Sequence, residues 1–161
     1  MQKGLSPLVS IVTLTWNTTD VTCDFLRSIN EHGTYKNLEV IVVDNGSKED
    51  PTAVFKAIYP EVKVILNGRN LGFTGGNNVG IRAATGDYLF IVNNDTEFTP
   101  GLIEGLLEIF DKYPDAGIVS PKFHYFFHKG TIEYAGYNTV NIFTGRNGMV
   151  GCKETDNGQY N

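Results

Sequence analysis

Hydrophobic residues fall into short runs that alternate with amphipathic segments over the first 112 residues. Four runs are rich in β-branched or aromatic residues and end at a polar residue, which is typical of buried strands. They cover residues 8–15, 38–43, 62–66 and 88–92. Because these runs are apolar on both faces, they favour a parallel sheet that is covered on two sides.

Segments with helical signals lie between the runs. Val21, Phe25, Leu26 and Ile29 recur at helical spacing after a threonine pair that can cap the helix start. We expect helices from residue 18 or 19 to about 32, over 51–59, from 75 to about 84, and from 99 or 100 to about 112. The alternation predicts an α/β fold with a doubly wound, mostly parallel sheet. The length predicts a single domain over residues 1–161.

The pattern weakens in the last third of the chain. Residues 117–120 predict a fifth short strand, and residues 123–127 and 132–134 are two further candidate strands. Residues 145–161 are mostly polar and show no helix or strand signal.

Polar residues recur where each predicted strand ends. Asn17 follows the first strand, Asp44 the second, residues 67–70 the third and residues 93–95 the fourth. In open parallel sheets, ligands bind at the edge formed by the carboxyl ends of the strands. These positions therefore indicate a binding site, although asparagine and aspartate are also common turn residues.

A glycine-rich segment, residues 70–78, precedes the third helix. Glycines permit close approach of backbone to ligand, and a helix N-terminus attracts anions. Tight helix–strand packing is the alternative explanation. The segment follows the third strand instead of the first, and the chain contains no GK[ST] sequence, so a dinucleotide-binding or ATP-hydrolysing protein is disfavoured.

One carboxylate, Asp95, stands at the end of the fourth strand. Mg²⁺ and Mn²⁺ prefer oxygen ligands, and Mg²⁺ often binds one or two carboxylates together with substrate phosphates and water. Asp95 is therefore a candidate metal ligand, with an ordinary turn or cap residue as the alternative.

The amino-acid composition argues against several classes of function. The net charge of −5 and the pI of about 5.1 argue against a nucleic-acid surface. Two cysteines without a CxxC pair argue against structural zinc and favour reduced thiols in the cytoplasm. No signal peptide and no membrane-spanning apolar run are visible. We expect a cytoplasmic protein, and peripheral association with the inner face of the cell membrane stays open.

The motifs at these strand ends resemble those of the inverting family-2 glycosyltransferases, which have the GT-A nucleotide-sugar-binding fold. They are VSIV with WN, VVDNGS, NLGF with NN and a later glycine, and NND, in this order and spacing between residues 8 and about 151. The stretch from residue 120 to residue 136 most resembles the rhamnosyltransferase-like branch.

The resemblance implies roles for individual residues. Trp16 packs on the nucleobase, Asp44 accepts a hydrogen bond from it, and Asn17 supports this loop. Arg69 reaches toward the diphosphate, and Asp95 binds Mg²⁺ or Mn²⁺. The nucleotide site that the resemblance implies comprises Thr15, Trp16, Asn17, Asp44, Asn45, Ser47, Arg69, Asn70, Gly72, Phe73, Asn78, Asn93 and Asn94. Within this set, Asn78 and the Gly72–Phe73 turn line the floor under the ribose and diphosphate, and Asn93 and Asn94 face the ribose or a metal-bound water.

The chain departs from the family pattern in two ways. Asn93 stands where the family's DXD metal motif begins with an acid, which removes one negative charge. The family's general base belongs to a later Glu-Asp motif, so we expect the base beyond Asn161 and assign none here. The late acids and histidines lie outside that motif: Glu133, Glu154, Asp156, His124 and His128.

The resemblance implies transfer of a sugar, with inversion, from a UDP-, dTDP- or GDP-sugar to a glycan, lipid-linked or protein acceptor. Two alternatives remain. One is a non-catalytic module that binds nucleotide sugars. The other is a sugar nucleotidyltransferase, which predicts a glycine-rich, basic loop after the first strand, whereas residues 16–19 are WNTT.

Overall fold

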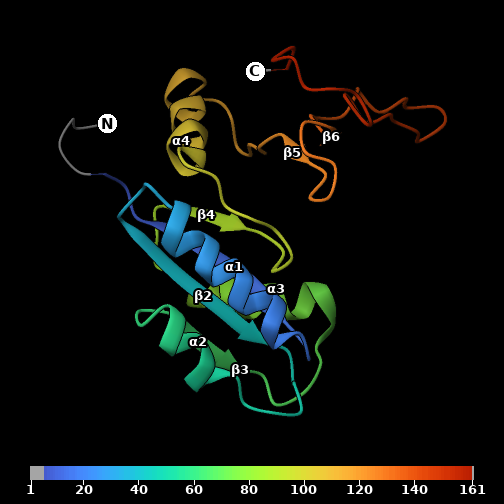
Figure 1. Ribbon diagram of the computed structural model, residues 1–161. Coiled ribbons are helices and arrows are strands. Elements are labelled where there is room, and N and C mark those ends of the chain that lie inside the picture. The colour runs from blue at the N-terminus through green and yellow to red at the C-terminus, as the bar shows by residue number, and fades with distance from the viewer. Residues whose placement is uncertain (1–5, 161) are drawn as a thin grey trace. The chain divides into compact units, whose positions relative to one another are not determined.

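The computed structural model describes residues 6–160, and the chain divides into two compact units (Figure 1). The first unit ends at Ile103 and the second begins at Glu104. The division falls near the start of helix α4 (Leu102–Lys112).

The first unit is built on a four-stranded parallel sheet. Its strands are β1 (Val9–Thr15), β2 (Leu38–Asp44), β3 (Lys63–Leu66) and β4 (Tyr88–Ile91), in the order β3-β2-β1-β4. In the register, Thr15 lies beside Asp44, and Asp44 lies beside Leu66. The carboxyl ends of these three strands therefore reach the same edge. The parallel α/β architecture predicted from the sequence is confirmed.

Helices cover both faces of this sheet: α1 (Thr19–His32), α2 (Thr52–Ile58) and α3 (Gly72–Ala83). Gly80 of α3 lies so close to Val12 of β1 that an added Cβ would collide with that side chain. Thr22 of α1 instead contacts Thr15, an odd-numbered residue on the opposite face of β1. Helix α1 crosses in front of the sheet in Figure 1 and packs against α2.

The core is concentrated on the two central strands. Residues 40–43 of β2 are almost entirely inaccessible to solvent, as are Phe25 of α1 and Phe55 of α2. The edge strands β3 and β4 leave Leu66, Leu89 and Ile91 about half exposed. Burial on both faces is thus found in the central strands β1 and β2, whereas the residues of β3 and β4 are partly buried or exposed.

Helix α3 begins at Gly72, three residues before the predicted start. Gly72 adopts a φ of 71°, and its N–H donates to Asn70 Oδ1 at 2.7 Å. Gly76 and Gly80 then lie against Leu14 and Val12 of β1. Close packing on the sheet therefore overrides the low helix propensity of glycine.

The second unit contains little regular structure after α4. Strands β5 (Phe123–His124) and β6 (Ile132–Tyr134) form an antiparallel pair. The predicted strand over 123–127 ends early because Tyr125 N donates to Thr131 O and the chain turns back. The fifth strand predicted over 117–120 is wrong: no neighbouring strand pairs with this segment in the described part of the chain, and Ile118 is almost fully exposed.

The segment after residue 144 agrees with its weak pattern. Residues 145–160 form no helix or extended strand, and only isolated bridges involve Met149 and Thr155. Cys23 and Cys152 are free thiols, as the cysteine pattern predicted.

Candidate functional site

The polar residues singled out in the sequence lie at the carboxyl ends of the strands and on the loops that follow them. The chain runs from β1 outward to β2 and β3, and then returns to place β4 on the other side of β1. The strand order therefore reverses between β1 and β4. Ligands of open α/β sheets bind in the crevice at such a switch point. The candidate residues thus lie at the edge where such ligands bind.

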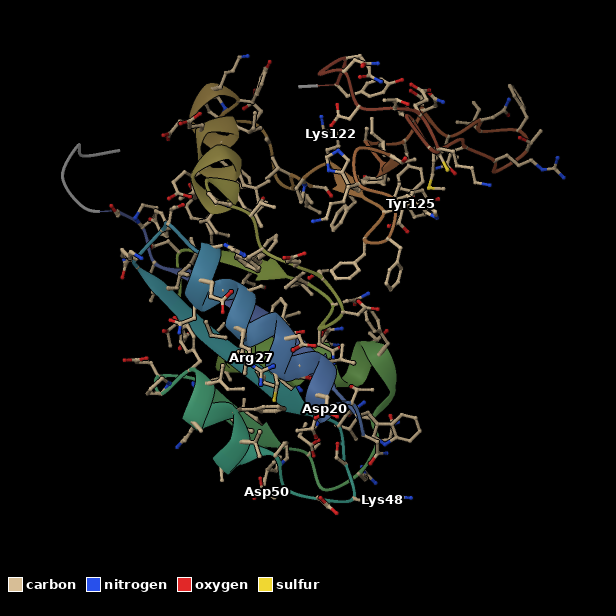
Figure 2. All side chains as sticks on the ribbon, viewed as in Figure 1. Asp20, Arg27, Lys48, Asp50, Lys122 and Tyr125 are labelled. Atoms are coloured by element: carbon tan, nitrogen blue, oxygen red, sulfur yellow. The ribbon has the colours of Figure 1, made fainter. Side chains whose placement is uncertain are left out.

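The loops after β1 and β2 are joined by two hydrogen bonds through Asn17. Its backbone N donates to Ser47 Oγ at 2.8 Å, and its side-chain Oδ1 accepts from Lys48 N at 3.0 Å. Asn17 has a φ of 55°, a conformation that asparagine adopts more readily than most residues. Figure 2 shows Lys48 and Asp50 on the loop after β2, with the Lys48 side chain pointing away from the protein. Asn17 thus braces this loop.

Asp44 sits at the end of β2 with its carboxylate almost completely buried. Its oxygens accept from Gly46 N at 3.2 Å and from Ser47 N at 3.0 Å. A carboxylate has about four acceptor positions, so Asp44 retains capacity for a further donor. Gly46 has a φ of 86°, and a Cβ there would come within 2.6 Å of the Arg69 backbone. Only glycine lets the loops after β2 and β3 approach this closely.

Asn45 joins the loop after β3 to the start of α3. Its Nδ2 donates to Asn70 Oδ1 at 3.0 Å and to Gly72 O at 3.2 Å. Its Oδ1 accepts from Leu71 N at 3.0 Å and from Asn67 Nδ2 at 3.1 Å. All four hydrogen-bonding positions of the buried amide are therefore used within the protein. This geometry makes Asn45 a support of the site, whereas the sequence suggested a direct nucleotide contact.

Several predicted site residues remain accessible at this edge. Trp16 is 54% exposed and Phe73 is 66% exposed, which leaves both rings available for stacking. The other exposed members of the predicted site are Asn17, Arg69, Asn70, Gly72, Asn78, Asn93 and Asp95. Asn78 accompanies Phe73 on α3, whereas the neighbouring Asn77 is buried and donates to Phe73 O at 3.1 Å.

On the loop after β4, one polar side chain is bonded to other residues of the protein and its neighbour faces solvent. Asn94 Nδ2 donates to Thr18 Oγ1 at 3.0 Å and to Thr22 Oγ1 at 2.9 Å. Thr22 in turn contacts the buried Thr15 Oγ1 at 2.9 Å. Asn94 and Thr15 thus interact with α1, whereas Asp95 is exposed to solvent. Thr18 and Thr22 were missed as site residues because their sequence positions indicate only the start of a helix.

The side chains available to coordinate an ion limit which kind of metal site can form. Within residues 6–160, no cluster of three or more His, Cys, Asp or Glu side chains is placed to hold an ion. The exposed Asp95 carboxylate makes no hydrogen bond or ion pair with this part of the chain. A single free carboxylate fits a Mg²⁺ or Mn²⁺ ion that completes its coordination with substrate phosphates and water. It does not fit an all-protein metal cage.

Late acidic residues in the second unit have local partners. Asp156 Oδ2 lies 2.7 Å from Lys122 Nζ and 2.6 Å from His124 Nε2. Hydrogen bonds from Lys122, the Gly158 N–H and His124 hold the pKa of Asp156 well below its ordinary value. Glu154 Oε2 accepts from the Tyr160 hydroxyl at 2.9 Å.

Comparison with known proteins places the chain among enzymes that transfer sugars. The model of the family described as "Glycosyl transferase family 2" matches residues 10–159. The glycosyltransferase YwdF of Bacillus subtilis is 33% identical over 118 residues, which cover 70% of this chain and 43% of YwdF.

Two solved structures share the fold. TarS 1-349 of S. aureus in complex with UDP superimposes with a TM-score of 0.59 at 20% identity, over 71% of this chain and 38% of that one. The mannosyltransferase PcManGT of Pyrobaculum calidifontis, in complex with GDP-Man and Mn²⁺, gives 0.57 at 21% identity, over 71% and 34%. The chain spans about two-fifths of the length of these proteins. None of the helices over residues 6–160 is long and apolar enough to cross a bilayer.

Proposed function

Because this chain belongs to glycosyl transferase family 2, we propose that it is the donor-binding part of a glycosyltransferase. The enzyme transfers a sugar from a nucleotide-diphosphate sugar to a glycan, lipid-linked or protein acceptor, with inversion. The observation that carries this proposal is the position of Trp16, Asp44 and Asp95 at or just after strand ends along one sheet edge, beside the switch point. The UDP complex of TarS and the GDP-Man and Mn²⁺ complex of PcManGT, both of this fold, support it.

The nucleobase binds between the loops after β1 and β2. The exposed Trp16 ring offers an apolar face on which a base can stack. Asp44 supplies the acceptor for a base N–H, since its carboxylate is oriented by two backbone donors and is nearly excluded from water. A hydrogen bond to such an ionised group is stronger than a neutral one.

The diphosphate binds between the start of α3 and the loop after β4. Arg69 and the first turn of α3 contribute positive charge, because the N–H groups of a helix N-terminus point toward an anion. Asp95 holds Mg²⁺ or Mn²⁺, which neutralises the charge that develops on the leaving diphosphate. Asn93 adds no charge, so we expect the metal to bind well only when the nucleotide supplies phosphate ligands.

A titration of Trp16 fluorescence tests the proposal, because Trp16 is the only tryptophan in the sequence. UDP, dTDP and GDP are each added with and without Mn²⁺. We expect at least one nucleotide to quench the fluorescence, and Mn²⁺ to strengthen its binding. The variant Asp95→Asn keeps the shape of the side chain and removes its charge, so it should abolish the Mn²⁺ effect alone. Absence of binding to folded protein, or a full Mn²⁺ effect in Asp95→Asn, would contradict the proposal.

A further inference from the structure

Four side chains form a hydrogen-bonded cluster beneath the switch point: Thr15, Thr18, Thr22 and Asn94, named here the hydroxyl cluster. Thr22 is its centre, since its Oγ1 accepts from Asn94 Nδ2 at 2.9 Å and lies 2.9 Å from Thr15 Oγ1 and 3.1 Å from Thr18 O. Thr22 is completely buried, although it is polar. Its hydroxyl therefore connects the end of β1, the first turns of α1 and the loop after β4.

The loop after β4 has two separate attachments to α1. Asn94 attaches it near the helix start, and Phe98 attaches it further along, where Phe98 N donates to Ser28 Oγ at 3.1 Å and the ring packs edge-on against Phe25. Between these points the chain turns, and Thr96 Oγ1 donates to Asn93 O at 2.9 Å. Asp95 lies inside this turn.

We propose that Thr22 is a positioning residue for the Asp95 carboxylate. Through Asn94, its hydroxyl fixes the turn that presents Asp95 at the switch point. The inference deepens the proposed function and rests on the metal role of Asp95. Thr22 contacts neither the metal nor the nucleotide, and it acts on a residue adjacent in sequence to the ligand.

Loss of the Thr22 hydroxyl should weaken metal binding more than it weakens binding of the nucleobase. Asn94 keeps a second partner in Thr18, so the turn loosens without detaching. The end of β1 and the loop after it also contact the Thr22 hydroxyl, through Thr15 Oγ1 and Thr18 O. This loop keeps other attachments when the hydroxyl is lost, because Asn17 is held by Ser47 and Lys48 and the Thr22 N–H still donates to Thr18 O. Groups that hydrogen-bond a metal ligand directly typically contribute about 10–100-fold to metal affinity. Thr22 acts through Asn94, the residue before the ligand, so about tenfold is the upper end of its expected contribution.

The test uses four single variants of the protein and one double variant. Thr22→Val keeps the shape and removes the hydroxyl, and Thr22→Ser keeps a hydroxyl. Asn94→Ala removes the hydrogen bond to Thr22 together with the one to Thr18. Thr34→Val is the matched control, since Thr34 Oγ1 accepts from Gly101 N and its loss also removes a hydrogen bond to the segment after β4. Electron paramagnetic resonance measures free Mn²⁺ in the presence of the tightest-binding nucleotide among UDP, dTDP and GDP. Trp16 fluorescence measures nucleotide affinity without metal.

We expect Thr22→Val to weaken Mn²⁺ binding up to about tenfold and to weaken metal-free nucleotide binding much less, with Thr22→Ser and Thr34→Val close to wild type. Combining Thr22→Val with Asn94→Ala should weaken Mn²⁺ binding no further than Asn94→Ala does alone, because Asn94→Ala already removes the hydrogen bond between Asn94 and Thr22. Unchanged Mn²⁺ affinity in Thr22→Val, equal losses of metal and metal-free nucleotide affinity, or additive effects in the double variant would overturn the inference. If Asp95→Asn also binds Mn²⁺ normally, the proposed metal role itself fails.

Discussion

Replacement of Asn45 by alanine provides the sharpest test of how the site is assembled. The substitution removes four hydrogen bonds at once, to Asn67, Asn70, Leu71 and Gly72. Each bond contributes about 1 kcal/mol net. Asn70 is exposed and Asn67 partly so, and water can replace their lost partner. The Leu71 N–H and the Gly72 carbonyl point at the buried Asn45 side chain, in whose place alanine offers neither a donor nor an acceptor. We therefore expect the free energy of unfolding to fall by about 2–3 kcal/mol.

Urea denaturation followed by circular dichroism measures this loss. The matched control is Asn78→Ala, because Asn78 is also an asparagine of the predicted site but is exposed on α3. Its stability should change by less than about 0.5 kcal/mol, while its affinity for UDP, dTDP or GDP falls.

The two asparagines should thus show opposite behaviour, one acting on stability and the other on binding. A loss below about 1 kcal/mol in Asn45→Ala would be less than one net hydrogen bond. That result would refute the argument that the Asn45 amide joins the loop after β3 to the start of α3. An equal loss of stability in Asn78→Ala would refute the distinction between supporting and exposed residues.

Three further substitutions test the packing and electrostatics of the first unit. Thr13→Val should raise the urea midpoint, with a gain of about 1 kcal/mol, because the buried Thr13 hydroxyl has no partner among the described residues. Gly46→Ala should lower the free energy of unfolding by roughly 1–3 kcal/mol, since φ is 86° and the new Cβ meets the Arg69 backbone; a neutral result in urea would contradict the close approach of the two loops. Burial raises the pKa of Glu39, but hydrogen bonds from Ser10 and Thr85 and the charge of Lys63 outweigh burial and lower it. The contribution of ionised Glu39 to the stability of the fold is therefore present above the pKa of about 4.3 that it has in the unfolded chain. This contribution is lost as the pH falls through the lower pKa that Glu39 has in the folded protein. The Tm of the wild type should consequently fall more steeply than that of Glu39→Gln in thermal scans below about pH 5, and parallel curves would exclude Glu39 as a source of acid sensitivity.

The sequence by itself determined the architecture of the first unit and the edge that carries its site. Parallel strands buried on both faces favour mostly apolar runs, and β1 and β2 are mostly apolar. Polar residues such as Asp44 and Asp95 lie at the end of a strand or in the loop after it, so a parallel sheet brings them to one edge without further information. Local patterns failed where a partner was needed: the apolar run 117–120 predicted a strand, but no neighbour supplies its backbone hydrogen bonds among the residues described.

Only the tertiary structure decided which polar side chains face solvent and which hold the loops together. An asparagine amide can serve a ligand or the protein equally well, because it carries both donors and acceptors. Asn45 and Asn78 are therefore indistinguishable in the sequence. Asn45 becomes a support because residues 22–27 positions away in the chain meet its amide. Asn94 turns toward Thr22, 72 positions away, while its neighbour Asp95 stays exposed. Such contacts depend on how the loops meet in space, and no periodicity or spacing along the chain records them.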